Sequence, residues 1–124
     1  MNSAKFNPAG GRLNAEIIIN GIGEATYHLK LAEKESSSEV ASWNGDNKDD
    51  KDDRFELPLP VDSNNGRVMR LDYSLSPRSE AANTAYVVQL NILQDDKIIG
   101  TSKETGIFSK TVVSSRLFIK LTSN

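Results

Sequence analysis

Hydrophobic and polar residues alternate with a period of two along much of the chain, and the longest such stretch covers residues 84–102. One face of its first half is apolar and the other is polar, which is the pattern of a strand buried on one side. An apolar segment returns after a short polar break. The stretch therefore predicts a β-hairpin whose buried face begins with Tyr86, Val88, Leu90 and Ile92.

The turn of this hairpin has two alternatives. A two-residue loop at 95–96 would place Leu93 opposite Ile98 and Ile92 opposite Ile99, so that apolar residues pair across the strands. Asp-Asp lacks the glycine that favours the positive φ of a type I′ turn. A four-residue type I loop that also takes in the two flanking residues is the alternative.

Other segments show the same alternation. Three successive isoleucines within 15–20 indicate a strand with apolar contacts on both faces, and the Asn20-Gly21 pair after it predicts a hairpin turn into the next strand. Further strands are predicted over 25–31, 40–43, 55–60, 69–75 and 111–121. Two prolines lack backbone N–H groups, so they confine 55–60 to a sheet edge or an extended connector.

Seven or eight antiparallel strands in a chain of this length predict an all-β fold with two packed sheets, a β-sandwich, because a single open sheet would leave an apolar face in water. A closed β-barrel is the alternative. Residues 13–124 are expected to form this single domain, with an acidic loop at 44–54. Residues 1–12 are polar and contain proline and two glycines, so we expect a flexible N-terminal arm unless the sheet or another chain holds it.

Composition narrows the classes of partner. The chain has 124 residues, 26% of them charged, with a formal net charge of −2, so nothing draws it as a whole to nucleic acid or to an anionic membrane. Cysteine is absent, which excludes disulfides, thiolate nucleophiles and cysteine-based metal centres. We therefore expect neither a nucleic-acid nor a membrane partner.

The N-terminal segment lacks the apolar core of a signal peptide, and no apolar run approaches the roughly 18 residues of a membrane span. A cytoplasmic location is the default expectation. A secreted or periplasmic domain whose signal has been removed is the alternative.

The acidic loop supplies the candidate metal ligands, Asp46, Asp50 and Asp52, whose carboxylates could bind Ca²⁺. Their spacing departs from an EF-hand, since counting from Asp46 puts Lys48 at position 3 and Lys51 at position 6. Interleaved charges of this kind are typical of a solvated loop. We expect no cofactor, with calcium as the alternative.

Candidates for catalysis are few. His28, the only histidine, lies on the polar face of a predicted strand between Thr26 and Lys30, as a surface histidine does. The chain has no Gly-x-Ser-x-Gly nucleophile motif, and its Gly-x-Gly precedes a strand pattern instead of the helix that would bind phosphate. We therefore expect that the protein is not an enzyme.

The function expected from these patterns is non-catalytic binding: protein–protein interaction, adhesion or assembly. The first alternative is a carbohydrate-binding, lectin-like module in which Trp43 and Tyr73, or Tyr86, stack on sugar faces, with calcium in the acidic loop as an aid to binding. An aromatic content of 6% is low for that alternative. The second alternative is a small enzyme built from loop carboxylates.

Overall fold

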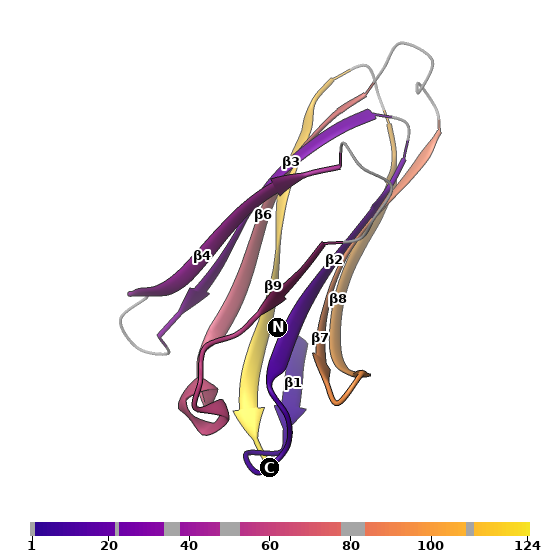
Figure 1. Cartoon of the computed structure of the whole chain (residues 1–124). Coiled ribbons are helices and arrows are strands. Elements are labelled where there is room, and N and C mark those ends of the chain that lie inside the picture. The colour runs from indigo at the N-terminus through magenta and orange to yellow at the C-terminus, as the bar shows by residue number, and fades with distance from the viewer. Residues whose placement is uncertain (1, 22, 34–37, 48–52, 78–83, 109–110) are drawn as a thin grey trace.

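The computed structural model describes residues 2–21, 23–33, 38–47, 53–77, 84–108 and 111–124. Within them, nine strands and one short 3-10 helix form two layers (Figure 1). The elements are β1 (Asn2–Phe6), β2 (Leu13–Asn20), β3 (Gly23–Ala32), β4 (Glu39–Asp46), β5 (Asp53–Glu56), η1 (Val61–Asn64), β6 (Val68–Pro77), β7 (Ala85–Gln94), β8 (Lys97–Ile107) and β9 (Val113–Ser123). None of the described helical structure is long and apolar enough to cross a membrane.

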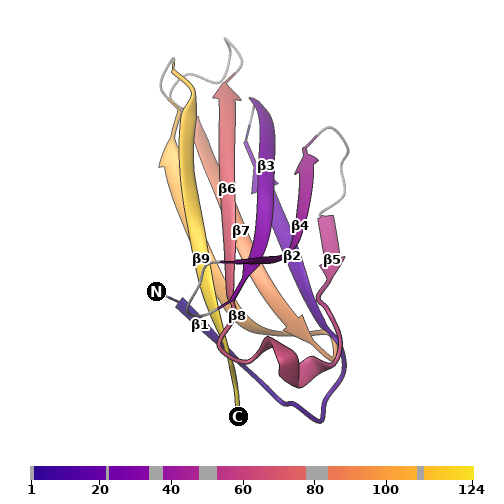
Figure 2. The same cartoon turned by 90° about the vertical axis from the view of Figure 1, so that its left-hand side faces the viewer.

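The strands form a five-stranded sheet, in the order β1-β9-β6-β3-β4, and a four-stranded sheet, in the order β5-β2-β7-β8. Figure 2 looks onto the five-stranded sheet, with the other sheet behind it. The predicted β-sandwich is confirmed, and the barrel alternative is wrong because neither sheet closes on itself. Among the described strands, β1 and β9 run parallel, which is a departure from the purely antiparallel expectation.

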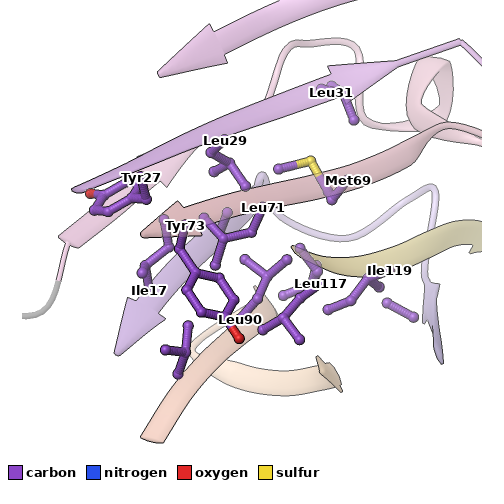
Figure 3. Close-up of a cluster of buried hydrophobic side chains, with 14 of the residues drawn as sticks. Ile17, Tyr27, Leu29, Leu31, Met69, Leu71, Tyr73, Leu90, Leu117 and Ile119 are labelled. Carbon is purple, nitrogen blue, oxygen red and sulfur yellow. The ribbon is translucent and has the colours of Figure 1, made fainter. Parts of the chain in front are cut away.

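Side chains from both sheets meet in one core between the layers (Figure 3). Leu29 of β3, Leu71 of β6 and Leu90 of β7 are each 0% exposed. In each of these strands the buried residues occupy every second position, so the alternation in the sequence dictates which face is buried. The predicted buried face of β7 is confirmed by the low exposure of Tyr86, Val88, Leu90 and Ile92.

The N-terminal residues belong to the sheet. A flexible arm over 1–12 was expected unless the sheet or another chain holds it, and for residues 2–6 the sheet does so, because β1 pairs with β9 and buries Ala4 and Phe6 completely. Gly100 of β8 permits this arrangement, since a Cβ there would lie 2.5 Å from the Cβ of Ala4. Two small residues thus let β1 and β8 approach at this edge of the sandwich.

The central hairpin turns through two residues, so the four-residue alternative is wrong. Asp95 and Asp96 adopt φ values of 52° and 61°, the left-handed region that a type I′ turn requires. Leu93 pairs with Ile98 as predicted, but Ile92 pairs with Gly100 instead of Ile99. A β-bulge inserts that residue and shifts the register by one.

The Asn20-Gly21 pair does not form the predicted hairpin. It connects β2 of the four-stranded sheet to β3 of the other sheet, which pair with different strands. Gly21 fits where a Cβ would lie 3.1 Å from both Phe108 and Tyr86, so packing at this end of the sandwich selects the glycine. The two ends of the predicted acidic loop belong to β4 and β5, and its residues 48–52 lie outside the described part.

Candidate ligand-binding hollow

The outward face of the five-stranded sheet carries a row of polar side chains. They occupy the strand positions between the core residues, and the strand register aligns Arg116, Asp72, His28 and Asn44 across β9, β6, β3 and β4. A hollow of about 710 Å³ lies over this face, within the range of 300–1,000 Å³ typical of small-molecule sites. The outward side chains that line it are Thr26, His28, Asn44, Arg70, Asp72, Ser74, Ser114 and Arg116.

Asp72 holds two arginines at the centre of the hollow. The Nε of Arg70, two residues before it on β6, donates to its carboxylate at 3.0 Å, and the Nε of Arg116 on β9 lies 3.4 Å from its Oδ1. Apart from Asp72, no residue that the structure describes forms a hydrogen bond or ion pair with either guanidinium. Two cations therefore share one anion, and the centre of the hollow carries local positive charge.

His28 is held at the side of the hollow towards β4. Its Nδ1 lies 2.7 Å from the side-chain oxygen of Asn44, and because that oxygen accepts, the ring nitrogen donates. Its Nε2 lies 3.7 Å from a carboxylate oxygen of Glu39. The sequence placed this histidine on the polar face of its strand, and the structure brings it into line with the arginines.

Hydroxyl groups line the other side. The side chains of Ser74 and Ser114 lie 2.9 Å apart across β6 and β9 and hydrogen-bond to each other. Thr26 is opposite Ser74 in the register, so it continues the same row onto β3. This side of the hollow offers donors and acceptors without charge.

The outer face of the four-stranded sheet is also polar, but its groups bond to one another. Asn91, 0% exposed, donates to Glu16 at 3.0 Å and accepts from Gln89 and Thr101 at 2.9 Å each. Arg54 donates through its Nε to the other oxygen of Glu16 at 3.0 Å. The amide and carboxylate at the centre of this network are enclosed by their partners.

The aromatic residues proposed for sugar stacking are buried or partly buried, and of them only Tyr73 is among the residues lining the hollow. Trp43 is partly buried against the core and stacks on Phe55 with ring centroids 5.6 Å apart, so it closes the edge between β4 and β5. Tyr73 and Tyr86 are 3% and 8% exposed. The expectation that these tyrosines are exposed is wrong, because they occupy inward positions of their strands, and their role in binding stays a prediction.

Two tyrosines of the inner face differ in how their hydroxyls are bonded. Tyr27 and Tyr73 are direct neighbours in the register, yet their rings point in different directions (Figure 3). Tyr27 donates to the carboxylate of Asp53, whereas the buried hydroxyl of Tyr73 forms no hydrogen bond of ordinary geometry within the described part, although Glu104 and Ser115 lie close to it. Burial, reinforced by the nearby Glu104 carboxylate, raises the pKa of Tyr73 above its ordinary value of about 10.

The predicted calcium ligands are mostly outside the described part. Asp46 ends β4 and is partly buried, while Asp50 and Asp52 fall in 48–52. Within the part of the chain that is described, no three histidine, aspartate or glutamate side chains come together as metal ligands. The expectation of no cofactor stays a prediction, and calcium in this loop stays its alternative.

Sequence reasoning missed most of the hollow. The predicted strands 69–75 and 111–121 contain Arg70, Asp72, Ser74 and Arg116, but none of these residues was a candidate for a site. The available signal was the i, i+2 spacing of Arg70 and Asp72, which puts both on one face of a strand. Their alignment with β9 depends on a register that local sequence does not specify.

Comparison of the chain with protein-family models, curated proteins and solved structures gives no match. The chemistry of its own residues must therefore carry the functional argument.

Proposed function

We propose that the protein is a non-catalytic binding module whose ligand occupies the hollow on the outer face of the five-stranded sheet. The observation that carries this proposal is the hollow itself, about 710 Å³ lined by polar side chains on hydrogen-bonded strands. Side chains on paired strands are held more rigidly than side chains on loops, which lowers the entropy lost on binding.

The arrangement of the polar groups supports binding over catalysis. A catalytic serine or histidine needs a nucleophile and a base in contact with each other. Here Ser74 and Ser114 bond to each other, and His28 bonds to the Asn44 amide, so none of these pairs joins a hydroxyl to a base. The pairs orient hydrogen-bonding groups towards the hollow, which suits recognition.

The lining favours a small polar ligand over a broad protein interface. Protein interfaces are centred on aromatic and other large side chains, whereas the outward lining of the hollow consists of hydroxyl, amide, imidazole, carboxylate and guanidinium groups. The carbohydrate alternative therefore gains support from hydrogen-bonding groups, without the aromatic stacking that the sequence suggested.

Protein–protein interaction is the second candidate, and a different surface favours it. Ile107 at the end of β8 and Val112 just before β9 are 68% and 59% exposed. Large exposed apolar side chains suit contact with another protein. Replacing both by serine should abolish retention of such a partner in pull-down experiments, and unchanged retention would exclude this surface.

A pair of tryptophan substitutions tests the hollow whichever small ligand it binds. Ser114→Trp fills the hollow, whereas Thr105→Trp places the same side chain on the exposed outer face of β8. Calorimetry against neutral oligosaccharides, acidic oligosaccharides and acidic peptides identifies the binders. We expect Ser114→Trp to weaken each binder by at least about tenfold and Thr105→Trp to leave its affinity unchanged. Equal effects of the two variants would contradict the proposal.

A further inference from the structure

The bonding pattern of Asp72 fixes two arginines in a particular way. Each arginine approaches the carboxylate with its Nε, which lies on the inner side of the guanidinium group. No described residue other than Asp72 forms a hydrogen bond or ion pair with either guanidinium group. The carboxylate thus anchors the arginines while it leaves their outer donors available.

The exposure of the three side chains suits a binding role. Arg70, Asp72 and Arg116 are 35%, 35% and 57% exposed, so the donors are accessible and still supported by the sheet. Planar guanidinium groups match the two oxygens of a carboxylate, sulfate or phosphate. One shared carboxylate leaves the group with an excess positive charge, which attracts an anion into the hollow.

We propose that Arg70 and Arg116 form an oxyanion subsite and that the ligand of the hollow is an acidic saccharide, bearing uronate or sulfate groups. This inference rests on the proposed function, because it assigns a ligand class to the same hollow. The guanidinium donors bind the charged group, and the hydroxyls of Ser74 and Ser114 and the side chain of Asn44 bind the sugar hydroxyls around it.

An acidic peptide fits the same surface less well. Extended peptides gain much of their affinity by pairing their backbone with a sheet edge. The hollow is centred on β3 and β6, which pair with a strand on each side, while Asn44 of β4 and Ser114 of β9 lie at its two rims. The backbone groups at the centre are taken up by the ladders, so side chains read a ligand that lies there, and those side chains match the hydroxyl groups of a sugar.

The test measures binding by the intact chain with isothermal titration calorimetry. The probes are a short oligogalacturonate, a sulfated oligosaccharide, a neutral oligosaccharide of the same length and an oligoglutamate peptide. We expect one or both acidic saccharides to bind at least about tenfold more tightly than the neutral sugar and the peptide. Comparison of the first two probes separates uronate from sulfate recognition.

A matched pair of variants locates the anion. Arg70→Gln with Arg116→Gln should lower the affinity for the acidic saccharide by at least about tenfold. Arg54→Gln is the control, because Arg54 lies on the other outer face, is 51% exposed and also contacts a carboxylate through Nε. It should change the affinity less than about twofold, since charges on opposite faces are screened from each other at physiological salt.

The outcomes separate the two proposals. Equal loss in the double variant and in Arg54→Gln would overturn the subsite, and so would equal affinity for acidic and neutral saccharides. Tighter binding of oligoglutamate would overturn the saccharide assignment. In these cases the hollow remains the binding surface if Ser114→Trp still blocks the bound probe. Arg70→Lys with Arg116→Lys keeps the charge and guards against misfolding, and it should weaken binding because lysine lacks the planar donor pair.

Discussion

The two outer faces of the sandwich each carry an arginine that contacts a carboxylate through its Nε, yet they differ in what surrounds that carboxylate. On the four-stranded sheet, Glu16 is only 13% exposed and also accepts from the buried Asn91. On the five-stranded sheet, Asp72 is 35% exposed, contacts two arginines and lies in an open hollow. The comparison teaches that similar polar pairs on strands can support the fold on one face and remain available to a ligand on the other.

The largest effect on stability is expected for the core beneath these faces. Leu90 is completely buried, and truncation to alanine should lower the free energy of unfolding by about 2–5 kcal/mol through lost burial and a cavity. Denaturant unfolding measures this value. This loss is the reference for the smaller losses expected from variants on the two outer faces. A loss below about 0.5 kcal/mol would show that the layers are assigned wrongly.

Asn91, the next residue on β7, points the opposite way and is equally buried. Asn91→Ala should cost about 1–3 kcal/mol because Oε1 of Glu16 and the hydroxyl of Thr101 lose their hydrogen bonds to the Asn91 amide. Chemical denaturation of the variant checks the value. A loss of stability as small as that expected for replacing an exposed polar residue would show that the network around Asn91 supports the fold no more than the polar groups of the hollow do.

Tyr73 tests whether a buried polar group stabilises the fold only when it is hydrogen-bonded. Its hydroxyl forms no hydrogen bond of ordinary geometry among the described residues, so Tyr73→Phe should leave stability unchanged or raise it by up to about 1 kcal/mol. The pKa of Tyr73 is raised in the folded state, so the unfolded chain releases this proton at lower pH than the folded chain does. The wild type should therefore lose stability as the pH rises above about 10.

Thermal unfolding of both proteins between neutral and alkaline pH checks this prediction. Tyr73→Phe removes the ionising group, so its stability should fall less steeply over the alkaline range. An identical pH dependence of the two proteins would show that Tyr73 does not contribute.

The smallest effect is expected inside the hollow. Ser74 bonds to Ser114 at its open surface, and Ser74→Ala should change the free energy of unfolding by no more than about 0.5 kcal/mol. The same denaturant experiment measures it. A cost comparable to that of Asn91→Ala would mean that the hollow supports the fold in the same way as the other face.

The sequence predicted the elements whose signal is local. The buried face of β7 follows from its alternation, and the two-sheet fold follows from the number of such strands. β1 escaped prediction because it has only five residues, and its partner β9 lies at the other end of the chain. Long-range pairing of this kind leaves no local pattern.

The residues of the hollow could not be predicted as a group for a related reason. Arg70, Asp72 and Arg116 look like ordinary solvated strand residues until the register of β6 and β9 places them together. For Tyr73 the sequence predicted an exposed ligand-binding residue where the structure has a buried one, since tyrosine is common both in cores and on binding surfaces. Burial decides between these roles, and burial is a property of the assembled sheets.

The most direct test of the central claim is NMR mapping of the binding surface during titration with an acidic oligosaccharide. The signals expected to shift are the backbone amides of Thr26, Asp72 and Ser114 and the side-chain Nε signals of Arg70 and Arg116. Signals of Gln89, Asn91 and Thr101 should stay in place, because these residues belong to the network on the other face. Shifts centred on that network, with no change around Asp72, would contradict the assignment of the five-stranded sheet as the ligand-binding face.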